Sequence, residues 1–359
     1  MDNLIKPLSN DDIHLAAHLF NPERLILARE FRGFTKAELA LRIGKTASAI
    51  SQFESGYFKP DPKTLASFAL ALGMPLGFFA LKSTIGPLMI DNCHFRSLRS
   101  ASQRERRRLL STAKLLYDLL VFINEFIDLP QQQVPRISSA INNIDDIEEC
   151  AVSVRKSWGL GLGPIPNLIG LLESKGVIVS FVPDSCREVD AFSFWYEQNP
   201  LIFLINEKNN SSRARFDAAH ELGHLVMHID AAPGNPELER QAHRFAGAFL
   251  LPKKSFMIEC PRRLNWQHFY ELKNRWKVSV AALLKRAFDL QYISESSYRR
   301  AFVQLNKRRE RIVEPHEPPM EMPTLLTHSI KLIADKWPIE AIALQLGLRT
   351  SDLKTLINV

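Results

Sequence analysis

The chain has 359 residues, of which 46% are hydrophobic and 24% are charged, and its formal net charge is +7. This length is too great for one ordinary core and predicts two or three domains. The apolar and charged fractions are ordinary for a globular protein. The basic balance favours contact with nucleic acid or an anionic membrane, although many soluble proteins are equally basic.

The cysteines and the apolar stretches indicate the compartment. Four cysteines lie far apart, without a CxxC pair, at positions 93, 150, 186 and 260. This spacing argues against a disulfide framework or a thiolate zinc site and fits a reducing cytoplasm. The opening MDNLIKPLSNDD has no apolar core and is therefore no signal peptide. The stretch from Leu65 to Leu81 is broken by Gly73, Pro75 and Gly77, which favours two buried helices over a membrane span.

The first predicted elements are short helices separated by glycines. One helical stripe ends at Gly33, which is a typical C-terminal helix residue. Thr35 then begins a helix with Glu38 three residues later, the pattern of a capping box. This helix ends at Gly44, and another follows over residues 46–54. Two short helices joined by a glycine turn predict a helix-turn-helix.

The segments FTKAELALRIGKTASAISQFESG and KPDPKTLASFALALG resemble the lambda-repressor/XRE family of DNA-binding domains. The resemblance implies a domain over residues 20–82 whose second helix enters the major groove of double-stranded DNA. By position, it implies base contacts from Ala47, Ser48 and Gln52. It also implies phosphate contacts from Lys36, Lys45, Thr46 and Lys59. The alternative is a helical hairpin used only for packing or dimerisation.

Residues 91–150 are predicted to form a helical linker region with a basic beginning. Six arginines and one glutamate lie between Arg96 and Arg108. This run either braces DNA phosphates beside the helix-turn-helix or forms a solvated helix face, and the sequence does not separate the two.

A helical run from Ser211 to His228 carries the motif His-Glu-x-x-His. On a helix, His220 and His224 project from one face about a turn apart, which is the spacing needed to bind one zinc ion. Glu221 lies next to the first histidine and is positioned to take a proton from a zinc-bound water. Ser211 or Ser212 is the expected N-cap.

A third ligand is expected from downstream, where NPELERQAHRFAGAFLLP reads as another helix. Glu239 and His243 lie one turn apart on it. His228 continues the i+4 series, and we interpret it as a residue that supports a ligand, because a ligand from another element gives better tetrahedral geometry.

The HELGH helix and the following ERQAHRFA segment resemble the ImmA/IrrE family of zinc metallopeptidases. The resemblance implies that Glu239 is the third zinc ligand. The sequence departs from the family pattern at His243, where asparagine is usual, and at Gln241, where glutamate is frequent. His243 is therefore either a residue that orients a ligand or an alternative ligand.

Upstream, three short runs are predicted to be β-strands, over residues 177–182, 192–195 and 201–205. The resemblance extends through DAFSFW and PLIFLIN and covers much of residues 91–318. A strand beside the zinc helix either binds a peptide by strand addition or only packs in the core.

The last segment, residues 319–359, follows a proline-rich hinge between Glu314 and Pro323. It is predicted to be a helical hairpin with a turn at Gly347. A second helix-turn-helix is the alternative, but the segment lacks a basic recognition face.

Together these elements predict an α+β, multidomain protein. An N-terminal all-α helix-turn-helix domain comes first, a mostly helical zincin-like domain with a small β-sheet spans residues 151–318, and a C-terminal helical region follows. The predicted function is a cytoplasmic, homodimeric transcriptional regulator without a membrane segment, whose zinc-dependent endopeptidase cleaves a regulatory protein such as a repressor. The alternative is a non-catalytic sensor in which zinc, peptide or metabolite binding alters DNA affinity. A role in a toxin–antitoxin or prophage switch is a third interpretation.

Overall fold

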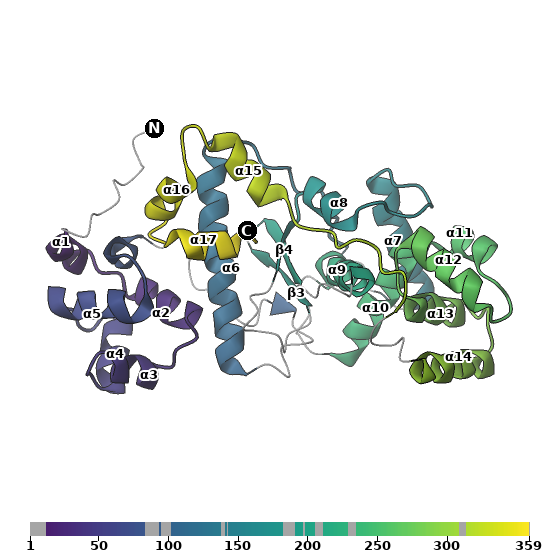
Figure 1. Ribbon diagram of the computed structural model, residues 1–359, viewed down its shortest axis with the longest axis horizontal. Helices are drawn as coiled ribbons and strands as arrows, with labels where there is room; N and C mark the ends of the chain where they lie inside the picture. Colours follow the sequence, from purple (N-terminus) through teal and green to yellow (C-terminus); the bar gives the residue numbers. More distant parts are fainter. Residues whose placement is uncertain are drawn as a thin grey trace. The chain divides into compact units, whose positions relative to one another are not determined.

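The computed structural model describes residues 12–82, 93–94, 102–137, 141, 143–181, 191–196, 198–204, 211–228, 235–308 and 314–358. The chain forms two compact units (Figure 1). Unit 1 comprises residues 1–90, 100–129 and 324–359, and unit 2 comprises residues 91–99 and 130–323. The helical stretch expected as a linker, residues 91–150, is therefore shared between the two units. The arginine run begins at Arg96 and Arg99, which lie outside the described residues.

Unit 1 is helical throughout its described residues. Its elements in chain order are α1 (Ile13–His18), α2 (Pro22–Phe31), α3 (Lys36–Arg42), α4 (Ala47–Glu54), α5 (Pro62–Leu72), the 3-10 helix η1 (Leu76–Ala80), α6 (Gln103–Asn124), α15 (Leu325–Ile333), α16 (Ile339–Gln345) and α17 (Thr350–Leu356).

The local signals in the sequence explain the helix boundaries of unit 1. The capping box predicted at Thr35 and Glu38 is confirmed, with both of its hydrogen bonds present. Gly33, Gly44 and Gly73 adopt positive φ angles of 68°, 65° and 60°, which glycine tolerates best. The apolar stretch 65–81 forms a helix and a 3-10 helix around Gly73, as predicted.

The C-terminal segment completes the core of the helix-turn-helix. It contains three helices, and Leu348 and Leu356 belong to the same buried cluster as the N-terminal helices. Gly347 lies so close to Phe78 that a Cβ atom on it would stand 2.8 Å from the Phe78 Cα. An ion pair of 2.6 Å joins Arg32 to Asp352. The predicted turn at Gly347 is present, and the hairpin acts as a cap rather than as a separate module.

Two of the four arginines of α6 form ion pairs within unit 1. Arg104 contacts Glu38 at 3.0 Å, and Arg107 lies 3.9 Å from Glu30. These contacts tie the basic start of α6 to α2 and α3, a role that neither sequence interpretation of the run considered.

Unit 2 combines a small sheet with helices. Its elements are β1 (Cys93–His94), α7 (Ile144–Ser157), α8 (Leu168–Ser174), β2 (Ile178–Phe181), β3 (Ala191–Tyr196), β4 (Asn199–Leu204), α9 (Ser211–Met227), α10 (Pro236–Leu250), α11 (Lys253–Glu259), α12 (Trp266–Trp276), α13 (Val280–Asp289) and α14 (Glu295–Lys307). The strand order is β1-β3-β4-β2, with β3 antiparallel to β1 and β4, and β2 parallel to β4. The α+β, multidomain fold class is confirmed.

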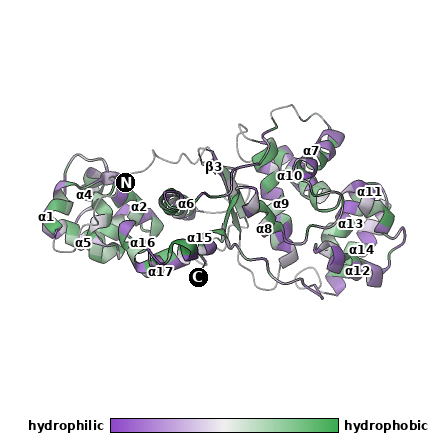
Figure 2. Ribbon diagram, turned by 90° about the horizontal axis from the view of Figure 1, so that it is seen from above, coloured by the Kyte–Doolittle hydropathy of each residue, from purple (hydrophilic) through white to green (hydrophobic). Residues whose placement is uncertain are grey.

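Helix α9 is the central helix of unit 2. It contacts the sheet through β3 and β4 on one side and packs against α8 and α10 (Figure 1). The residues of β2, β3 and β4 are almost all buried. The helices mix hydrophobic and hydrophilic residues (Figure 2). At Gly223, a Cβ atom would lie 3.3 Å from the Ala242 Cα and 3.0 Å from the Phe245 ring. The glycine therefore allows α10 to approach α9 closely.

A strap of residues 314–323 holds three helix N-termini through three glutamates. The carboxylate of Glu314 accepts from the Val280 N–H on α13, and that of Glu317 accepts from the Ser212 N–H on α9. Glu321 accepts from the Leu168 N–H on α8 in the same way. Negative charge is favourable at these positions because helix N-termini carry partial positive charge. A serine was expected to cap the N-terminus of α9, but the carboxylate of Glu317 accepts from its backbone instead.

Among the described residues, no helix has both the length and the apolar character that a membrane span requires.

Candidate metal centre and nucleic-acid interface

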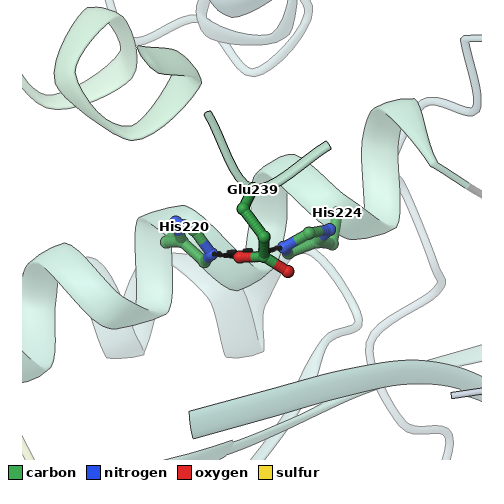
Figure 3. Close-up of side chains that lie close together, drawn as sticks. All are labelled: His220, His224 and Glu239. Atoms are coloured by element: carbon green, nitrogen blue, oxygen red, sulfur yellow. Dashed lines mark hydrogen bonds and ion pairs between the residues drawn. The ribbon is translucent and has the colours of Figure 1, made fainter. Parts of the chain in front are cut away.

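Helices α9 and α10 bring three potential ligand atoms together (Figure 3). His220 and His224 project from one face of α9, and Glu239 reaches them from the first turns of α10. The two Nε2 atoms are 3.2 Å apart. Glu239 Oε2 lies 3.2 Å from His220 Nε2 and 3.6 Å from His224 Nε2. The two histidines and the glutamate that were predicted as ligands therefore share one site.

These separations fit a tetrahedral metal ion. Protein ligands lie about 2.0–2.2 Å from zinc, so two tetrahedral ligand atoms are about 3.3–3.6 Å apart. The observed separations of 3.2, 3.2 and 3.6 Å are close to that range. A single proton can lie between only two of the atoms at a time, whereas one cation can bond all three. The donor set of two imidazoles and one carboxylate, with a fourth position left for water, is that of catalytic zinc.

A relay of side chains orients His224. Gln241 Oε1 lies 2.9 Å from His228 Nε2, and His228 Nδ1 lies 3.0 Å from His224 Nδ1. Because the amide oxygen only accepts, His228 donates to it from Nε2 and accepts at Nδ1. His224 then donates from Nδ1 and presents the lone pair of Nε2 to the metal site. Burial is the main reason that the pKa of His228 is lowered to about 4, so His228 stays neutral in this role.

Glu221 is buried beside the sheet and is not one of the three converging groups. Ser193 of β3 donates a 2.6 Å hydrogen bond from Oγ to Glu221 Oε2. Burial, with a smaller contribution from the charge of Glu239, raises the pKa of Glu221 to about 8 despite this hydrogen bond. Bound cations favour the ionised form of nearby carboxylates. Ser193 thus fixes the carboxylate that the motif predicts as the base.

Glu239 has the opposite electrostatic setting. Burial opposes its ionisation, but hydrogen bonds and charge from His220 and His224 outweigh burial and hold its pKa well below the usual range. Glu239 is therefore ionised, as a metal ligand must be.

His243 lies beside the ligands and is not one of the three converging groups. Its ring centroid is 4.7 Å from that of Phe216 and 6.3 Å from that of His220. It lines two cavities, one of about 350 Å³ and one of about 920 Å³, and Glu239 lines the larger. The geometry places His243 at the entrance to the site.

The candidate DNA-reading residues lie on and beside α4. The side chains expected at base edges, Ala47, Ser48 and Gln52, are all exposed. Thr46 is exposed as well and caps α4, its Oγ1 accepting from the Ala49 N–H. Lys45 is also exposed.

Two other lysines expected at phosphates have contacts within the protein. Lys36 Nζ donates to Ser51 Oγ at 3.2 Å and lies 3.3 Å from Glu54 Oε2. Lys59 Nζ donates to the His18 carbonyl at 2.6 Å. Both must share or give up these contacts to bind a phosphate.

Two family models match the chain. Residues 172–288 match the IrrE N-terminal-like domain, a peptidase family, and residues 25–79 match the Helix-turn-helix family. The chain joins a helix-turn-helix domain to an IrrE-like metallopeptidase domain. No match was found among curated proteins. The ligand cluster lies entirely within the IrrE-like match, and α4 lies within the helix-turn-helix match.

Sequence reasoning missed two residues of this site. Ser193 was predicted only to be part of a β-strand. Gln241 was noted only as a departure from the family pattern. The alternation of β3 places Ser193 between two buried phenylalanines, and a polar residue at such a position was the available signal. Gln241 has no comparable signal in the sequence, because its contact with His228 depends on how α9 and α10 pack.

Proposed function

We propose that this protein is a DNA-binding transcriptional regulator whose IrrE-like domain is a zinc-dependent endopeptidase that cleaves a regulatory protein, such as a repressor. The convergence of His220, His224 and Glu239 within 4.8 Å carries the proposal. The helix-turn-helix match and the exposed face of α4 support an operator in double-stranded DNA as the second partner.

His220, His224 and Glu239 would hold the zinc ion. When bound, zinc supplies Lewis acidity, which lowers the pKa of water and polarises a peptide carbonyl. The chain supplies the proton acceptor, since Glu221 takes the proton of the attacking water and delivers it to the leaving amine. Ser193 keeps the Glu221 carboxylate in one orientation, and the Gln241–His228 relay keeps His224 in one tautomer.

Glu221→Gln tests this mechanism. The variant keeps the size of the side chain and all three ligands, so it should bind zinc as the native chain does and lose proteolysis by at least about 100-fold. Glu149→Gln is the matched control, because Glu149 is exposed on α7 and lines neither cavity beside the site, so cleavage should stay unchanged. Unchanged cleavage by the Glu221 variant would contradict the mechanism.

The second candidate is a non-catalytic sensor, and the order of the two units along the chain supports it. Unit 2 interrupts unit 1 in sequence, because residues 324–359 return to the helix-turn-helix core. Binding within unit 2 can thus bias a DNA-binding unit whose parts flank it. Regulation of a reporter that survives in the Glu221→Gln variant would favour the sensor, and its loss would favour the peptidase.

The proposal includes a homodimer in the cytoplasm. Single helix-turn-helix modules usually bind two half-sites as pairs. Cys150 and Cys260 are buried free thiols, which fits a reducing compartment. Sedimentation of the full chain with and without operator DNA tests the oligomeric state.

A further inference from the structure

The smaller cavity beside the ligand cluster has a wall of partly exposed aromatic side chains. Phe216 from α9 and Tyr298 and Phe302 from α14 line it, and Ala281 and Ala282 of α13 line it as well. All five pack against the core of unit 2 and yet remain partly exposed. Apolar cavities of about 300–1,000 Å³ that keep such surface open are typical ligand sites.

Shared residues connect the smaller cavity to the ligand cluster. Phe216 precedes His220 by four residues, so the two side chains lie on the same face of α9. His243 and Lys285 line both cavities, and the larger one includes Glu239. A chain whose carbonyl lies at the ligand cluster can therefore place a neighbouring side chain in the smaller cavity.

The charged groups around the cavity are compensated within the protein. Arg213 lies 3.6 Å from Asp217, and Lys285 lies 2.6 Å from Asp289. Glu314 and Glu317 both contact the buried Lys273, at 2.8 and 2.5 Å. A charged occupant would compete with these pairs, whereas a neutral apolar occupant leaves all of them in place.

We infer that this cavity is the specificity pocket of the site and accepts a large apolar side chain, aromatic or branched aliphatic, next to the scissile bond of the peptide. This inference rests on the proposed function. The alanines at 281 and 282 leave the room that such a side chain needs, and the aromatic wall supplies its contacts.

The test uses equilibrium binding and requires no cleavage. Zinc-loaded full-length Glu221→Gln protein is titrated with hydroxamic acids bearing a benzyl, isobutyl, methyl or carboxymethyl group. The hydroxamate anchors each compound to the metal, and the substituent probes the cavity. The benzyl and isobutyl compounds should bind at least about 10-fold more tightly than the methyl compound, and the carboxymethyl compound should bind most weakly.

Two variants locate the effect in the pocket. Ala282→Phe fills the cavity and should remove the advantage of the benzyl group while methyl binding stays constant. Phe302→Ala enlarges it and should favour a naphthylmethyl over a benzyl compound. Val303→Phe is the matched control, because Val303 is exposed on α14 and does not line the cavity, so the native order should persist.

The outcomes separate the pocket from the metal site. Equal affinities for the benzyl and methyl compounds, with both bound, would overturn the pocket alone. A benzyl advantage that survives in Ala282→Phe, or a Phe302→Ala variant that still binds the benzyl compound more tightly than the naphthylmethyl compound, would also overturn it. Failure of every hydroxamate to bind would contradict the metal site and the pocket together.

Discussion

Two groups of buried polar side chains, one in each unit, differ in how their donor and acceptor atoms are paired. In unit 1, Arg29 donates from Nε to Glu54 Oε1 at 2.5 Å, a donor matched to an acceptor, and both side chains are 4% exposed. In unit 2, two imidazole nitrogens and one carboxylate oxygen, from His220, His224 and Glu239, lie within 4.8 Å of one another, and one proton can join only two of them. The first arrangement is complete without any other group. The second becomes complete when a cation bonds all three atoms, so the comparison separates a structural ion pair from a binding site.

The largest expected effect is on metal affinity. Replacing His224 with alanine should weaken zinc binding by about 100- to 1,000-fold, because one of three protein ligands is lost from a binding free energy on the order of 10 kcal/mol. Competition with a chelating indicator measures the affinity. His243→Ala is the control and should change it less than 10-fold. A loss at His243 equal to that at His224 would show that the ligand set is misassigned.

In unit 1, Glu54→Gln should lower the free energy of unfolding by about 3 kcal/mol, because it leaves the buried Arg29 without its main counter-charge. Denaturant unfolding of the metal-free chain measures this. In the same assay, His220→Ala should cost less than about 1 kcal/mol, since the cluster of ligand atoms contributes little without metal. Equal losses in the two variants would remove the distinction between the groups.

The relay should have an intermediate effect. Gln241→Leu removes the acceptor for His228 and should weaken zinc binding by about 10- to 100-fold, the usual effect of residues that orient a ligand. Gln241→Glu restores an acceptor and should bind zinc at least as tightly as the native chain. An unchanged affinity in the leucine variant would mean that His224 is oriented by other contacts.

The smallest effects are expected at the DNA-reading face, where exposed side chains act one at a time. Gln52→Ala should cost about 1–2 kcal/mol in operator binding and relax specificity at one base pair. Lys45→Ala should weaken binding to all sequences and reduce the salt slope by about 1. Lys354→Ala, an exposed lysine on α17, is the matched control. A control loss equal to that at Lys45 would place the DNA elsewhere on unit 1.

Local patterns made much of both regions predictable. The capping box at Thr35, the glycine turns and the i,i+4 histidines depend on residues within two helical turns of each other. Glu239 was predicted because its helix follows the motif helix and resembles a family pattern. These features need little knowledge of the tertiary structure.

Long-range contacts were not predictable in the same way. Glu317 caps α9 from 105 residues away, and Leu356 joins a core that begins near Ala16. Neither contact has a periodic signal, because only the path of the folded chain brings these residues together. The proline-rich segment was predicted as a hinge, and its three glutamates instead hold helix N-termini.

The most direct test of the central claim is a crystal structure of the zinc-loaded chain with diffraction recorded at the zinc absorption edge. The account predicts one strong anomalous peak within about 2.0–2.2 Å of His220 Nε2, His224 Nε2 and a Glu239 carboxylate oxygen. A peak held by His228 or His243, or no peak among the three ligand atoms, would contradict it.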